Sequence, residues 1–343
     1  MCFFACNQTA EKPVEEVKAE AVLSAAEYHN NSGRKDVLTG GVQMIPITTP
    51  KGDFKVWTKR IGNNPKIKVL LLHGGPGMTH EYLESFDSYL PQEGIEYYYY
   101  DQLGSYYSDK PEDPELWTIP RFVEEVEQVR KALNLDKDNF YLLGHSWGGI
   151  LAMEYALKYQ DNLKGLIISN MMMSVKDYND YAHNVLGKKF PAGVLEKIEA
   201  FEAAEKFQDK EYLALINKHH YPRHVLRMPL DTWPEPVNRS FGHGNYDIYT
   251  QMQGPSEFGI AGDASLLNWD RVADLPKIKV PTLSLGGQHD TMDPEHMKMI
   301  ADKVQKGRAV ICPNGSHLSN YDDAENYFAG LIKFLKDVDK EKL

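Results

Sequence analysis

The sequence predicts an α/β fold: a mostly parallel, doubly wound sheet with an inserted helical cap. Two observations lead to this prediction. Short apolar runs punctuated by Gly or Pro alternate with helical patterns, and strands that alternate with helices require parallel crossovers. The stretch from about Ser174 to Asp270 breaks this rhythm, because it contains helix formers, His, Trp and Pro but no clear strand.

Each predicted element follows from a local pattern. Two strand-like runs flank the turn signal at 50–53 and predict an opening hairpin. In the predicted helices, apolar residues recur at spacings of three and four. The predicted strands cover residues 42–48, 54–59, 67–72, 95–100, 140–143, 163–169, 280–285 and 308–312, and the clearest helices cover 119–133, 150–159 and 322–338. The implied organisation is a leader (1–35), a first core segment (36–173), the cap (174–270) and a second core segment (271–343).

Composition excludes several classes of protein. The 343 residues are 42% hydrophobic and 25% charged, as in an ordinary globular protein. The formal charge of −11 is spread along the chain, so the electrostatic footprint of a nucleic-acid partner is missing. Three cysteines cannot form a disulfide framework, and no CxxC or Cys/His cluster suggests zinc. We therefore expect no metal and no cofactor.

The N-terminus allows two interpretations. MCFFACNQ is apolar and precedes a polar stretch, but a complete secretory signal needs a basic start and a longer apolar core. FFAC resembles the end of a bacterial lipoprotein signal, with Cys6 as the lipidated residue and a membrane anchor as the consequence. The alternative is a short cytoplasmic leader, so localisation stays open between the cell envelope and the cytoplasm.

A candidate nucleophile lies in YLLGHSWGGI (141–150), where an apolar run precedes G-x-S-x-G and a helical pattern follows. This order is typical of a nucleophile elbow, a strained strand-to-helix turn that exposes the serine and needs small neighbours. A serine hydroxyl is a weak nucleophile and requires a base that is oriented by a carboxylate. The motif predicts that Ser146 is the nucleophile of an α/β-hydrolase fold.

The partners of Ser146 are expected in the order Ser, Asp, His. LSLGGQHDTMDP places Asp290 just after a late strand, and CPNGSHLSN places His317 just after the last one. Both positions are at the carboxyl ends of parallel strands, where ligands bind in open α/β sheets. Asp293 lies further along its loop, and the alternative base His289 is adjacent to Asp290, which makes a hydrogen bond between them awkward.

Oxyanion donors are expected in two places. The backbone N–H of Trp147 follows the nucleophile, and LLLHGGPGMTHEY (70–82) supplies a glycine-rich loop after an early strand. We choose Gly75 as the second donor. A phosphate-binding loop fits badly, because neither GxGxxG nor GxxxxGK[ST] is present.

With HGGPG (73–77), DQLGS (101–105) and GHSWGG (144–149), the chain resembles the proline iminopeptidase family of serine aminopeptidases from about residue 41 to 335. HVLRMPLDTWPEPV (224–237), GPSEF (254–258) and LLNWD (266–270) resemble cap signatures of these enzymes and of related amino acid amidases. The resemblance implies release of an N-terminal amino acid, typically proline, from short peptides or amino acid amides. It implies an acyl-enzyme and no metal.

By this resemblance Glu257, in GPSEF, would bind the α-amino group of the substrate. Two departures bear on specificity. Thr291 follows Asp290 where family members often have a second acid. The substrate ammonium therefore has one fewer partner, unless Glu295 or a cap acid serves instead. Leu103 stands where many proline-specific members have arginine. We therefore keep a broad aminopeptidase or amidase, and an esterase on the same fold, as alternatives.

Overall fold

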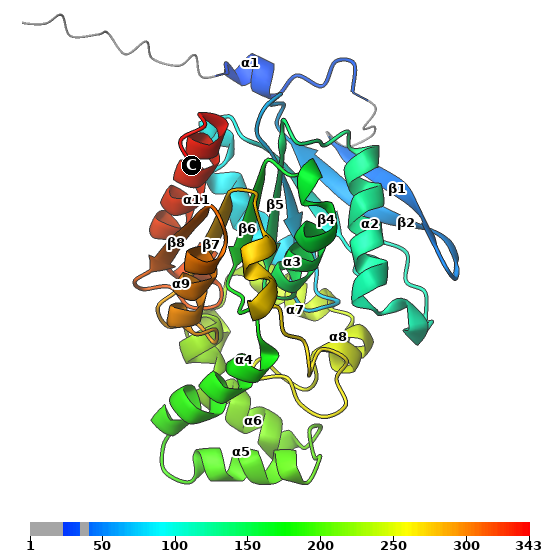
Figure 1. Ribbon diagram of the computed structural model, residues 1–343. Helices are drawn as coiled ribbons and strands as arrows, with labels where there is room; N and C mark the ends of the chain where they lie inside the picture. The colour runs from blue at the N-terminus through cyan, green and yellow to red at the C-terminus, as the bar shows by residue number, and fades with distance from the viewer. Residues whose placement is uncertain (1–22, 35–40) are drawn as a thin grey trace, which may run out of the picture.

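The computed structural model describes residues 23–34 and 41–343. Cys6 and most of the predicted leader lie outside the described residues. The described chain forms a sheet covered by helices on both faces, with a group of helices beyond one edge of these layers (Figure 1). The fold class predicted from the sequence is confirmed.

All eight predicted strands are present, in the order β1-β2-β4-β3-β5-β6-β7-β8. β1 and β2 form the expected hairpin, β2 pairs antiparallel with β4, and all other neighbours are parallel. The strands are β1 (Val42–Thr49), β2 (Gly52–Ile61), β3 (Lys68–Leu72), β4 (Glu96–Asp101), β5 (Phe140–His145), β6 (Gly165–Ser169), β7 (Thr282–Gly287) and β8 (Gly307–Cys312).

The helices separate into two covering layers and an insertion. On one face of the sheet, α2, α3 and α9 pack into one hydrophobic cluster, and on the other the 3₁₀ segment η1 (His80–Ser88) and α11 pack into a second. The helices are α1 (Ala25–Tyr28), α2 (Ile119–Ala132), α3 (Trp147–Tyr159), α4 (Val175–Tyr181), α5 (Val194–Ala203), α6 (Lys210–His219), α7 (Glu235–His243), α8 (Tyr246–Met252), α9 (Pro294–Lys303), α10 (Ser319–Asp322) and α11 (Ala324–Asp339).

The helices α4 to α8 all lie between β6 and β7. Ser174 and Asp270, where the sequence predicts that the insertion begins and ends, pair in an isolated antiparallel bridge. Residues of α5 and α6 have a small hydrophobic cluster of their own. We therefore propose to treat residues 174–270 as one inserted unit, the cap, which leaves and re-enters the core at a single point.

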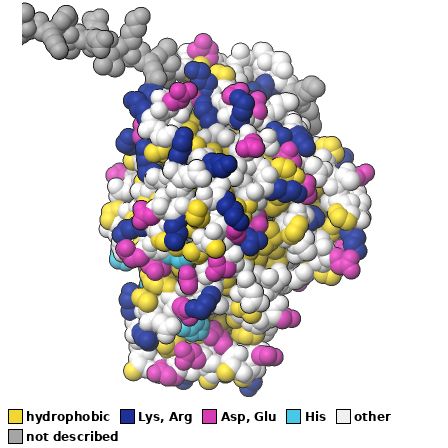
Figure 2. Space-filling view, viewed as in Figure 1, with side chains coloured by type: hydrophobic (Ala, Val, Ile, Leu, Met, Phe, Trp, Pro, Cys, Tyr) yellow, Lys and Arg dark blue, Asp and Glu magenta, His cyan; other side chains and the backbone are white. Residues whose placement is uncertain are grey.

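The space-filling view shows basic and acidic side chains interspersed on the face turned to the viewer (Figure 2). None of the helices in the described residues is long and apolar enough to cross a membrane.

Candidate active site

Ser146 lies between β5 and α3, at the carboxyl edge of the sheet. Its backbone has φ 56° and ψ −125°, a conformation that a non-glycine residue rarely adopts. The neighbouring glycines make this turn possible. A Cβ on Gly144 would lie 1.9 Å from the carbonyl oxygen of Gly148, and one on Gly148 would lie 2.2 Å from that of Leu72. The elbow therefore requires glycine at both positions.

Asp290 and His317 meet beside this elbow, because β7 and β8 are parallel neighbours whose carboxyl ends are in register. His317 Nδ1 lies 2.9 Å from Asp290 Oδ1. Two further groups donate to the carboxylate: the Asn170 amide to Oδ2 at 2.7 Å and the Met292 backbone N–H to Oδ1 at 3.0 Å. The buried Asp290 is thus held as an acceptor that orients the imidazole.

The electrostatics of His317 suit a base. Burial disfavours its charged form, but the charge and hydrogen bond of Asp290, with a contribution from Glu257, outweigh burial and raise the pKa of His317. Ser146 Oγ makes no hydrogen bond with the described residues, His317 included. In enzymes without bound substrate, such catalytic hydrogen bonds are often long and shorten in the substrate complex.

The glycine-rich loop after β3 passes directly beside Ser146. A Cβ on Gly74 would lie 2.9 Å from Ser146 Cβ, and Gly75 has φ 112°. The backbone N–H groups of Gly75 and Trp147 donate to no other group in the described part of the chain. The Trp147 side chain is fixed elsewhere, since its Nε1 donates to Gln102 at 2.9 Å.

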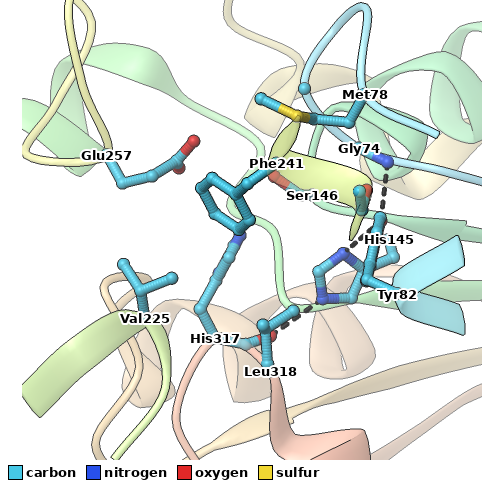
Figure 3. Close-up of a pocket in the computed structure, with 12 residues that line it drawn as sticks. Gly74, Met78, Tyr82, His145, Ser146, Val225, Phe241, Glu257, His317 and Leu318 are labelled. Carbon is cyan, nitrogen blue, oxygen red and sulfur yellow. Dashed lines mark hydrogen bonds between the residues drawn. The ribbon is translucent and has the colours of Figure 1, made fainter. Parts of the chain in front are cut away.

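A pocket opens above Ser146, and the cap forms one of its walls. The Glu257 carboxylate points into this pocket from the side opposite Ser146, with Phe241 and His317 between them in the view (Figure 3). The lining residues are Gly74, Gly75, Met78, Tyr82, His145, Ser146, Val225, Ser240, Phe241, Glu257, His317 and Leu318. Among these described residues, Glu257 is the one acid.

Glu257 is anchored through both its side chain and its backbone. Tyr249 on α8 donates to the carboxylate at 2.7 Å. The Glu257 carbonyl accepts from Tyr178 at 2.7 Å, from Thr291 at 2.9 Å and from His220 at 2.8 Å. Burial raises the pKa of Glu257, while His317 and Tyr249 oppose this shift. A cation bound beside the carboxylate would lower this pKa again.

The residues weighed as alternatives lie elsewhere. Asp293 caps α9 by accepting from the Glu295 N–H at 3.0 Å, and Glu295 is exposed and paired with Lys298. Leu103 is buried in the hydrophobic cluster on the α2 and α3 face. Thr291, which replaces the second acid, fixes the backbone of Glu257 rather than facing the pocket. No group of His, Cys, Asp and Glu in residues 23–34 and 41–343 is arranged to hold a metal ion.

Sequence reasoning missed three residues of this site. Asn170, which holds Asp290, directly follows a predicted strand, so its position at the carboxyl edge was a signal that could have been used. Tyr249 and Tyr82 lie near Glu257 and Gly74 in sequence, but no short motif marks either hydrogen bond.

Comparisons with known proteins agree with this architecture. A sequence model of the alpha/beta hydrolase fold matches residues 68–324. A proline iminopeptidase from Flavobacterium johnsoniae is 56% identical over 300 residues, which are 88% of this chain and 100% of that protein. One from Elizabethkingia meningoseptica is 57% identical over 296 residues, 86% of this chain and 98% of that protein.

The crystal structure of a proline iminopeptidase from Mycobacterium smegmatis has a TM-score of 0.76 at 28% identity, covering 88% of this chain and 99% of that one. With relatives above half identity along nearly their whole length and the fold in common, the chain belongs to the proline iminopeptidase family of α/β hydrolases.

Proposed function

We propose that this protein is a serine aminopeptidase that releases an N-terminal amino acid, preferentially proline, from short peptides or amino acid amides. The observation that carries the proposal is the partly buried carboxylate of Glu257, which faces the pocket above Ser146. An acid drawn away from water is stabilised by a cationic partner or a proton. The free ammonium of a substrate is such a partner, and the names of the relatives support the same substrate class.

The chemistry follows from the three side chains. Ser146 Oγ attacks the carbonyl carbon of the first residue while His317 Nε2 takes the hydroxyl proton. His317 then returns this proton to the leaving amine as the C–N bond breaks, which leaves an acyl-enzyme that water hydrolyses by the same steps. Asp290 keeps the proton on Nδ1 and stabilises the imidazolium. The N–H groups of Gly75 and Trp147 bind the oxyanion.

The pocket favours an exopeptidase. An N-acylated substrate would leave the Glu257 carboxylate buried without a cation, at a cost comparable to that of an unsatisfied buried charge. Val225 and Phe241 of the cap line this pocket together with Glu257 and Ser146. The substrate therefore enters with its free N-terminus towards Glu257 and its scissile carbonyl at Ser146.

A panel of aminoacyl β-naphthylamides (Pro, Ala, Leu, Phe), run beside N-acetylated versions and a p-nitrophenyl ester, tests the proposal. We expect fast release from free prolyl substrate, none from its acetylated form, and loss of nearly all turnover in Ser146→Ala. Cleavage of the ester alone would refute the peptidase assignment.

Even rates across the four residues would instead indicate a broad aminopeptidase or amidase. The observation that favours this second candidate is Thr291, which leaves Glu257 as the one acid among the described residues that line the pocket.

A further inference from the structure

A chain of hydrogen bonds connects the oxyanion loop to the base through two side chains that the mechanism above does not use. The Gly74 N–H lies 2.7 Å from Tyr82 Oη, Tyr82 Oη lies 2.9 Å from His145 Nδ1, and His145 Nε2 lies 2.8 Å from the carbonyl oxygen of His317. Figure 3 shows Tyr82 between Gly74 and His145, with His317 beyond. Tyr82 and His145 are both buried.

The partners fix the direction of every bond. The carbonyl of His317 can only accept, so His145 Nε2 carries a hydrogen. Burial lowers the pKa of His145 to about 3, so the ring is neutral and its Nδ1 is an acceptor. Tyr82 therefore donates its hydroxyl hydrogen to Nδ1, and its oxygen accepts the Gly74 N–H. Each donor has one acceptor, so the three hydrogen bonds have a single possible set of directions.

These hydrogen bonds join three segments that are distant in sequence. Gly74 belongs to the loop after β3, His145 is the last residue of β5, and His317 follows β8. Gly74 also precedes the proposed oxyanion donor Gly75, and His145 precedes Ser146. A shift of any one segment would change the distances between oxyanion donor, nucleophile and base.

We propose that Tyr82 and His145 are positioning residues, which hold the oxyanion loop and the His317 backbone in register with Ser146. The inference rests on the proposed serine mechanism but not on its amino-acid specificity. It deepens that mechanism by naming what sets the catalytic geometry: Tyr82 acts through Gly74, and His145 acts through His317.

Tyr82→Phe tests the proposal, because it keeps the ring and removes the hydroxyl that two groups share. Loss of one oxyanion donor lowers kcat by roughly 10²- to 10³-fold, and a misplacement of about 1 Å costs about 10²-fold. For a loop that is loosened rather than lost, we expect kcat to fall about 10- to 100-fold, with KM within about twofold. An aldehyde analogue of the best substrate forms an oxyanion adduct with Ser146, and its binding affinity should fall by the same factor. Binding of the free amino acid product should not change.

Tyr141→Phe is the matched control. Tyr141 lies on β5, the strand that ends at His145. Like Tyr82 it donates one buried hydroxyl hydrogen bond, to the Leu335 carbonyl at 3.2 Å, but outside the pocket. We expect a comparable loss of thermal stability with unchanged kcat. His145→Gln, whose amide has both a donor and an acceptor, should retain more activity per titrated active site than His145→Leu.

The proposal is overturned if Tyr82→Phe keeps the wild-type kcat, or if aldehyde and product binding weaken together. Equal activity of the Gln and Leu variants would also contradict it. Hydrolysis of the p-nitrophenyl ester separates this result from the proposed function. If the wild-type protein cleaves only the ester, the aminopeptidase assignment fails, while Tyr82→Phe should still lower ester kcat.

Discussion

Replacing Glu257 by Gln tests the recognition of the substrate ammonium. The change keeps the shape of the side chain and preserves an acceptor for the Tyr249 hydroxyl, which donates to the carboxylate at 2.7 Å. It removes the one acidic group among the pocket residues that the structure describes. Folding should therefore be little affected, and the loss should appear in catalysis.

The magnitude follows from the contact that is lost. A hydrogen bond to a charged group contributes about 1.5–3 kcal/mol, and about 1.4 kcal/mol corresponds to a factor of ten. We expect kcat/KM for free-amine prolyl β-naphthylamide to fall by roughly 10- to 150-fold.

The assay compares each variant on the free-amine substrate and on a neutral ester that lacks an amino group. Glu257→Gln should lose activity on the first substrate only. Glu295→Gln is the matched control, since Glu295 is exposed on α9 and pairs with Lys298. If Glu257→Gln kept full activity on the free amine, or lost it equally on the ester, the ammonium would not be bound by this carboxylate.

Three further predictions concern the base, the elbow and the cap. Because His317 must be neutral to accept a proton and its pKa is raised, kcat/KM should fall as the pH drops through a pKa above the ordinary histidine value. Asp290→Asn should move this limb to lower pH and reduce kcat by roughly 10⁴-fold; an unmoved limb would contradict the pairing. Gly148→Ala, whose Cβ would lie 2.2 Å from a β3 carbonyl oxygen, should lower the unfolding free energy by about 3 kcal/mol or more, measured by denaturant titration. Arg239→Met removes the ion pair of α7 with the buried Glu81, at 2.7 Å. It should lower stability by about 1–2 kcal/mol and raise KM, whereas an unchanged Tm would show that this pair does not hold the cap.

Local patterns in the sequence were sufficient for the strands and for three of the helices that cover the sheet. All eight strands and the helices α2, α3 and α11 form where apolar periodicity predicts them. The elbow has a local cause at Gly144, whose Cβ would meet the carbonyl oxygen of Gly148, whereas glycine is needed at 148 because β3 passes beside it. Asp290 and His317 were identifiable because each directly follows a strand.

Contacts between distant segments were decided only by the tertiary structure. The strand order places β6 beside β7, which brings Asn170 within 2.7 Å of Asp290. Folding of the cap itself brings Tyr249 to Glu257, and packing of η1 on the sheet brings Tyr82 to His145. A sequence pattern reports the periodicity of one element, whereas these hydrogen bonds depend on how two or three elements meet. The sequence by itself therefore determined the elements and the candidate reacting groups, and the tertiary structure decided what holds those groups in place.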